Sequence, residues 1–150
     1  LGRNLVIENV STYMTFKQSE YTEWDFLTEV SKRTDSKLLL DINNIYVSSA
    51  NHGFDPFEYI DKIPTNIVSQ VHLAGYTDMG DFLFDTHSKP VYPEVWKLFK
   101  TFIKKAPNVP FIMEWDDDIP EFQIVEGEVL KAIDIWKEVH DEGEKSNVKK

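Results

Sequence analysis

The 150-residue chain contains no cysteine. A disulfide framework and a thiolate metal site are therefore excluded, and any metal ion must be held by nitrogen and oxygen ligands, which suits iron, manganese or zinc. Basic residues are also few, since 16 lysines and arginines stand against 26 aspartates and glutamates, for a formal net charge of −10. Because general nucleic-acid binders use clustered cations to neutralise phosphates, we expect no nucleic-acid partner.

Long hydrophobic runs are missing as well. No apolar stretch approaches the roughly 20 residues that span a bilayer, so we expect no membrane insertion. The first residues, Leu1-Gly2-Arg3, have neither an initiator methionine nor the apolar core of a signal peptide. We therefore expect the chain to begin inside a larger protein, and we expect a cytoplasmic location.

Two common enzyme motifs are absent. The sequence has no Gly-x-Ser-x-Gly elbow and no glycine-rich phosphate loop, so neither a serine nucleophile nor nucleotide hydrolysis is expected. What the chain does contain is a regular alternation of short apolar runs and helical patterns. Strands are expected at residues 5–7, 37–40, 66–73, 82–84 and 110–113, and helices at 22–33, 42–50, from 55 onward, 93–105 and about 120–140. Thr22 and Asp55 are the expected caps of two of these helices, with Pro56 at a first helical position. The helix at 93–105 should carry an apolar stripe of Val95, Leu98, Phe99, Phe102 and Ile103.

This alternation predicts a parallel α/β sheet with helical cover. A complete TIM (β/α)8 barrel takes about 250 residues, so five β/α units predict the carboxy-terminal portion of one. We expect residues 1–150 to form a single domain, with a disordered tail at 142–150. The alternative is an open doubly wound sheet, which should have a glycine-rich turn after its first strand, where this chain has Glu8-Asn9-Val10-Ser11.

Carboxylates and imidazoles stand at or just after the ends of the expected strands. They are Glu8, Asp41, His72, Asp85, His87 and Glu114. Because the carboxyl ends of barrel strands converge on one cavity, these residue types predict a metal site there. Asp85 and His87 are two residues apart, so on an extended segment both would face the same way and could share one ion.

Each of these residues also has a purely structural interpretation. Glu8 could pair with Arg3 or cap a helix, His72 could be a hydrogen-bonded core residue, and Asp85-Thr86-His87 could be a turn. The acidic run Asp116-Asp117-Asp118 is interpreted as a solvated loop that caps the helix near Pro120, with no catalytic role.

Six segments, at residues 7–13, 38–48, 51–56, 72–75, 85–87 and 114–116, carry a family resemblance. In this order they resemble the multinuclear iron proteins typified by the methanobactin-biosynthesis oxidase, also filed as domain of unknown function 692. The resemblance implies a xylose isomerase-like TIM barrel. It also implies a cofactor of two or three iron ions, with zinc or manganese as alternatives.

By this resemblance Glu8 would bridge two metal ions, and Asp41, His72 and Glu114 would complete one site. Asp85 and His87 would hold a further ion. In the family, two more histidine ligands would come from strands that precede the first residue of this chain.

The resemblance also implies supporting residues around the ions. Asn44 is the expected amide-oxygen ligand, with Asn43 close to it. Asn9 and His52 are expected to support the ligands or contact the substrate.

The implied activity is that of an iron-dependent oxygenase or oxidase that modifies cysteine residues of a ribosomally made peptide, delivered by a partner protein. One alternative is a divalent-metal hydrolase or isomerase on the related barrel. Another is a non-catalytic barrel fragment that self-associates through exposed sheet edges. We expect the 150-residue chain alone to be inactive and prone to associate.

Overall fold

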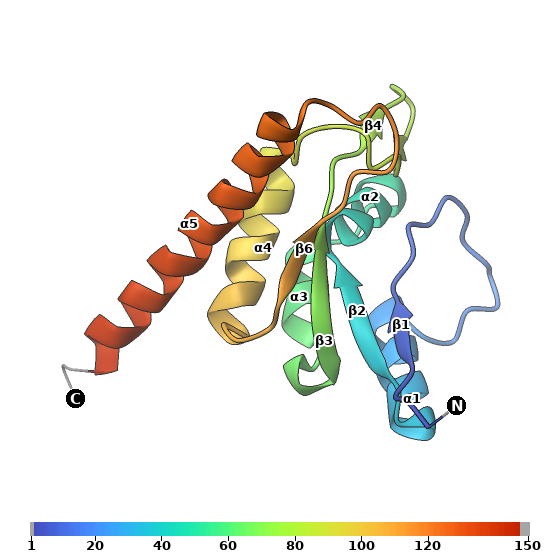
Figure 1. Ribbon diagram of the computed structural model, residues 1–150. Coiled ribbons are helices and arrows are strands. Elements are labelled where there is room, and N and C mark those ends of the chain that lie inside the picture. The colour runs from blue at the N-terminus through green and yellow to red at the C-terminus, as the bar shows by residue number, and fades with distance from the viewer. Residues whose placement is uncertain (1, 148–150) are drawn as a thin grey trace.

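The computed structural model describes residues 2–147, with side chains up to residue 142. The strands are β1 (Val6–Glu8), β2 (Lys37–Asp41), β3 (Val68–Leu73), β4 (Thr77–Asp78), β5 (Leu83–Phe84) and β6 (Phe111–Met113). The helices are α1 (Glu23–Thr34), α2 (Ile42–His52), α3 (Pro56–Lys62), α4 (Pro93–Lys105) and α5 (Phe122–Asn147), with a 3-10 turn η1 (Thr65–Ile67). Figure 1 shows their arrangement.

Four parallel strands form the main sheet in the order β1-β2-β3-β6, with the helices packed on one of its faces (Figure 1). The spatial order follows the chain order, whereas a doubly wound sheet reverses its order at a switch point. This mixed α/β architecture is compatible with part of a TIM-like barrel. Within the described residues, β1 and β6 each leave one edge unpaired.

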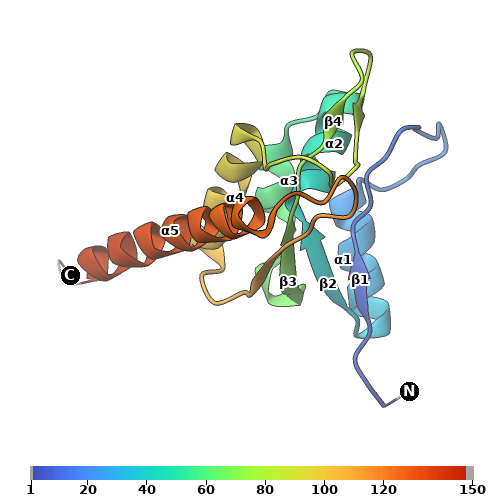
Figure 2. The same cartoon turned by 45° about the horizontal axis from the view of Figure 1, so that its top comes forward.

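The expected strand at residues 82–84 does not belong to this sheet, so the prediction of five parallel units was wrong. Its residues form β5, which pairs antiparallel with β4. Residues 74–82 are too few for the crossover of about a dozen residues that a parallel connection needs. A hairpin turn at Gly80, with φ of 89°, is the connection that fits. Figure 2 shows this hairpin and the β1–α1 loop beyond the carboxyl ends of the strands.

Side chains alternate between the two faces of the sheet. Leu38, Leu40 and Leu73 face the helices and are fully buried against α2, α3 and α4. The apolar stripe expected on residues 93–105 is confirmed: Val95, Leu98, Phe99, Phe102 and Ile103 are all fully buried. This one-sided burial is what fixes the strand register, because a slip of one residue would expose the apolar set.

The opposite face of the sheet has no helical cover in the described chain. The pairings Glu8–Leu39, Leu39–Gln70 and His72–Ile112 place these side chains on that face. Val6 and Ile112 remain 45% and 49% exposed there. The polar residues expected at the metal site and a set of apolar residues thus share one open face.

Helix starts follow the predicted capping residues. The hydroxyl of Thr22 accepts a hydrogen bond from the Asp25 N–H (3.3 Å) at the start of α1. Asp55 caps α3, with Pro56 at its first position. Both predictions are confirmed.

The last helix is longer than expected. It reaches Asn147, whereas a disordered tail was predicted from residue 142. An ion pair between Lys104 Nζ and Glu142 Oε2 (3.2 Å) links this part of α5 to α4. Residues 148–150 of the predicted tail lie outside the described residues. No helix in the described part of the chain combines the length and the apolar character required to cross a membrane.

Gly75 is the residue at which the fold tolerates no side chain. A Cβ at this position would lie 2.1 Å from the carbonyl oxygen of Lys89 and 2.4 Å from that of Pro90. We expect Gly75→Ala to lower the free energy of unfolding by about 1–3 kcal/mol or more, because backbone must move to relieve the overlap. Urea unfolding measures the change.

Gly127→Ala is the matched control. Gly127 lies within α5 and has nothing within 4 Å of the added methyl group. This variant should raise the free energy of unfolding by about 0.5–1 kcal/mol, since alanine favours helix. Equal effects of the two substitutions would contradict the close approach at Gly75.

Candidate metal centre

Parallel pairing brings the expected ligands to one edge of the sheet. Asp41 at the end of β2 pairs with His72 on β3. Glu114 follows β6 and donates its N–H to the Leu73 carbonyl (2.9 Å). With Glu8 from β1, these residues offer ligand atoms that all lie within 4.8 Å of one another. Four predicted ligands from four strands therefore form one group.

His87 is the centre of a second group that also contains Glu114. His87 Nδ1 lies 3.2 Å from Glu114 Oε2 and 3.4 Å from Asp116 Oδ2. On the other side of the ring, Nε2 lies 2.8 Å from Asp85 Oδ1 and 3.6 Å from Asp41 Oδ2. Both groups therefore adjoin each other and share a carboxylate.

Asp85 and His87 meet, but not through an extended segment as their spacing suggested. His87 has a positive φ of 46°, which bends the chain. The Asp116 N–H donates to the His87 carbonyl (2.8 Å) and holds this conformation. Asp116 was assigned to a solvated loop from the sequence, yet it contacts the ring of His87. Its position two residues after Glu114 was the available signal.

Asp41 is fully buried, and its two carboxylate oxygens have different surroundings. Oδ1 accepts from the Asn44 N–H (2.7 Å) and caps α2, while Oδ2 has no hydrogen-bond partner. Asn9 holds the same residue by its backbone: its Oδ1 accepts from the Asp41 N–H (2.7 Å) and its Nδ2 donates to the Asp41 carbonyl (2.9 Å). Burial raises the pKa of Asp41 to about 8, against the lowering effect of the His87 charge.

Asn43 and Asn44 point in different directions at the start of α2. The Asn43 amide nitrogen donates to Asp85 Oδ1 (2.6 Å), whereas that of Asn44 donates to the Asn9 carbonyl (3.0 Å). Both amide oxygens are buried and have no hydrogen-bond partner. The structure therefore brings Asn43, and not Asn44, against Asp85 of the predicted second site.

His72 is held at both ring nitrogens. Nδ1 lies 2.8 Å from Glu114 Oε2, and Nε2 accepts from the amide nitrogen of Gln70 (2.8 Å). Sequence analysis missed Gln70, although it lies two residues before His72 on the same face of β3. A half-turn of its amide would present the oxygen to a protonated Nε2 and leave Nδ1 free for an ion.

The electrostatics of both groups favour a bound cation. Burial acts to lower the pKa of His87, but the contact with Asp85 and the charge of Asp41 raise it overall to about 9. Burial and then the charge of Glu114 raise the pKa of Glu8. Among the described residues, no ion pair joins Glu8 to Arg3, and the ion pairs of the clustered carboxylates are with histidine alone.

The geometry of these residues fits metal ions. Two ligand atoms about 2.1 Å from one ion and about 90° apart lie about 3 Å from each other. The contacts around His87 span 2.8–3.6 Å. Both His87 nitrogens and Asp41 Oδ2 are buried without a hydrogen-bond partner, which is otherwise costly. Carboxylate, imidazole and amide donors are the set that iron, manganese and zinc accept.

His52 and its neighbour Asn51 lie outside both groups. His52 Nε2 contacts the Thr12 carbonyl oxygen (3.0 Å) and hydroxyl (2.9 Å) in the β1–α1 loop. Asn51 accepts from the Leu83 N–H (2.8 Å) and donates to the Leu83 carbonyl (3.0 Å). The end of α2 thus fastens the β1–α1 loop and the hairpin that leads to Asp85.

The family model for the RiPP precursor modification enzymes MbnB/TglH/ChrH matches residues 1–137. RiPPs are ribosomally synthesised and post-translationally modified peptides. A UPF0276 protein of Acaryochloris marina is 46% identical over 132 residues, which cover 88% of this chain and 48% of that protein. A UPF0276 protein of Anaeromyxobacter sp. is 43% identical over 135 residues, 90% of this chain and 48% of the relative.

The chain thus spans about half the length of the curated relatives that it matches. The match confirms the resemblance drawn from the six segments, and it runs through every residue of the two groups. This chain belongs to the MbnB/TglH/ChrH family of RiPP precursor modification enzymes.

Proposed function

We propose that this chain supplies most ligands of a multinuclear iron centre in an oxygenase or oxidase that modifies cysteine residues of a ribosomally made peptide. The observation that carries the proposal is the meeting of Glu8, Asp41, His72 and Glu114 beside His87, with buried ligand atoms that lack partners. Family membership supports the peptide substrate. Iron, when bound, would supply a binding site for thiolate and dioxygen and the capacity to exchange electrons.

The first group and the contact between Asp85 Oδ1 and His87 Nε2 (2.8 Å) support a division of the ligands between two ions. Asp41, His72 and Glu114 would hold one ion together with Glu8, and Asp85 with His87 would hold a further one. The contact with Asp85 favours Asn43 over Asn44 as the amide-oxygen ligand. Asp116 lies near His87 Nδ1, on the opposite side of the ring from Asp85, so it would not share the ion that Asp85 and His87 Nε2 hold.

The protein's own residues would manage the protons of this centre. Without a cation, burial raises the pKa of Asp41 and so favours its protonated form. A metal ion would displace that proton, so binding should release protons and strengthen as the pH rises. Asn9 would keep Asp41 in place during the exchange through its two bonds to the Asp41 backbone.

The full-length protein would complete the centre. The curated relatives are about twice as long as this chain, and within residues 2–147 β1 and β6 each have a free edge to which further strands could add. We propose that such strands supply two more histidine ligands and that a partner protein delivers the peptide. The isolated chain should then be inactive and prone to self-association.

Metal content tests the proposal most directly. Full-length protein purified without oxygen and reconstituted with Fe(II) should hold two or three iron ions per chain by elemental analysis. Asp41→Asn should remove at least one equivalent, because the buried carboxylate contacts both groups. Asp81→Asn, at an exposed position in the β4–β5 turn, should leave the content unchanged.

Less than about one equivalent of any transition metal in the folded, reconstituted protein would falsify the multinuclear centre. Zinc bound in preference to iron would instead favour a divalent-metal hydrolase or isomerase.

Asp85 and His87 should ligate the same ion, since His87 Nε2 lies 2.8 Å from Asp85 Oδ1. Asp85→Ala and His87→Ala should each remove one equivalent of metal, and the double variant should remove no more. Elemental analysis of the three variants decides the point. Loss of two equivalents only in the double variant would assign the residues to different ions.

Gln70 should act as a positioning residue through His72. Gln70→Leu keeps the size of the side chain but leaves the imidazole without its partner, so iron affinity should fall about 10–100-fold. Gln70→Glu, which can still accept from Nε2–H, should restore most of the affinity. Chelator competition with Fe(II) measures both, and equal affinities of parent and Gln70→Leu would rule the role out.

A further inference from the structure

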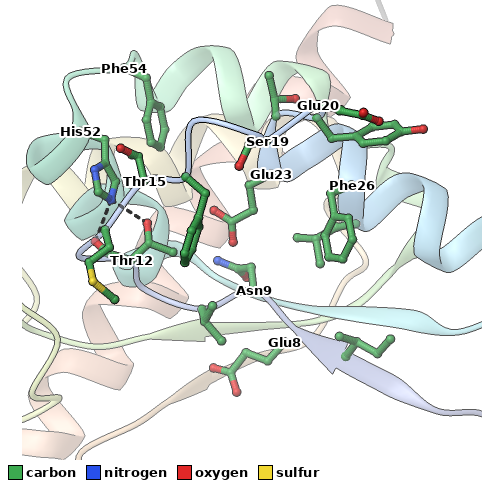
Figure 3. Close-up of a pocket in the computed structure, with 17 residues that line it drawn as sticks. Glu8, Asn9, Thr12, Thr15, Ser19, Glu20, Glu23, Phe26, His52 and Phe54 are labelled. Atoms are coloured by element: carbon green, nitrogen blue, oxygen red, sulfur yellow. Dashed lines mark hydrogen bonds between the residues drawn. The ribbon is translucent and has the colours of Figure 1, made fainter.

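A cavity of about 590 Å³ adjoins the candidate metal centre. Its walls come from the end of β1, the β1–α1 loop, the first turn of α1 and the end of α2 (Figure 3). Glu8 lines the cavity and also belongs to the first metal group. A molecule in the cavity would therefore lie beside a residue of the centre, and the cavity volume falls within the roughly 300–1,000 Å³ typical of ligand sites.

Most of the wall is apolar. It includes Ile7, Met14, Phe16, Phe26, Leu27 and Phe54. Met14 and Phe16 are 73% and 68% exposed. Large apolar side chains held in water at a cavity mouth are characteristic of binding sites.

The charged groups of the wall are all acidic. They are Glu8, Glu20 and Glu23, and neither lysine nor arginine lines the cavity. Glu23 projects into the space beside Asn9 (Figure 3). Burial raises the pKa of Glu23 to about 7, against the lowering effect of a hydrogen bond from the Val10 backbone. Carboxylate or phosphate ligands are therefore disfavoured, whereas neutral apolar groups fit the wall.

The loop that forms this wall is fastened to α2. The Thr12 N–H donates to Ser48 Oγ (3.0 Å), and the Thr12 hydroxyl lies 2.9 Å from His52 Nε2. His52 itself lines the cavity. The contact with Thr12 holds the cavity wall in place. His52 therefore supports this wall and does not support a metal ligand.

We propose that this cavity binds one or two apolar residues of the peptide substrate next to the residue that is modified at the metal centre. The inference rests on the proposed function, which supplies the peptide. The cavity lies at the carboxyl end of β1, where β/α barrels bind their substrates, whereas an added strand would lie along the edge of β1. Because Glu8 belongs to both the cavity wall and the first metal group, the apolar residue would lie in the cavity and the modified residue at the metal centre.

Two blocked dipeptides test the specificity: acetyl-Phe-Ser-amide and acetyl-Asp-Ser-amide, each titrated into metal-free full-length protein and followed by NMR. The Phe peptide should bind at least about tenfold more tightly than the Asp peptide. Its side chain is neutral and apolar, whereas the Asp carboxylate would be repelled by the acidic groups of the wall. Ser19→Trp, which fills the cavity, should weaken its binding at least about tenfold. Gln18→Trp is the matched control, since Gln18 is exposed and does not line the cavity, and should bind like the parent.

Phe16→Glu is a second variant, whose effect does not depend on filling the cavity. It too should weaken binding of the Phe peptide. Three results would each overturn the inference. They are equal binding of the two peptides, binding that neither Ser19→Trp nor Phe16→Glu affects, and no binding because other parts of the full-length protein occupy the cavity. The probes carry no thiol and the protein carries no metal. Failure here is thus separate from failure of the iron centre, which metal analysis detects.

Discussion

Parallel pairing of β2, β3 and β6 is the constraint on which the candidate centre depends. The register that opposes Asp41 to His72 also places Glu114 beside the end of β3. The same register buries Leu40, Val71 and Leu73 against the helices. A shift of the strand register by one residue would expose these apolar side chains and would turn the candidate ligands toward the helices. The energy that fixes the fold therefore also fixes the ligand geometry.

Burial sets the chemistry at this edge. Carboxylates from four strands converge there, and among the described residues histidine is the cation that pairs with them. Concentrating such groups costs stability unless protons or a metal ion compensate. The raised pKa values of Asp41 and Glu8 follow from that cost, because the charged form of each carboxyl group is disfavoured there. A site with this balance is one in which metal binding, proton release and stability are coupled.

Sequence alone could bring the candidate ligands together because each lies at or just after the end of an apolar run, and it located helix starts because capping residues act locally. It failed where long-range geometry decides. Asn43 and Asn44 diverge by about 100° on α2, and only the direction of that helix selects Asn43 for Asp85. Asp116 meets His87 through a left-handed turn that local pattern does not encode. Chain length between β3 and β5 could have excluded the fifth parallel strand.

The face that bears the candidate ligands also bears the apolar side chains of Val6, Leu39 and Ile112, each two residues before a polar residue of the centre. In a β/α barrel this face is filled by layers of side chains. A layer of that kind below Glu8 and His72 would keep water from reaching the ligands through the barrel. Water would then reach a bound ion from the carboxyl end of the strands, where the cavity lined by Glu8 and the β1–α1 loop lies. The surface that we propose to bind peptide would therefore also limit the solvent around a bound ion.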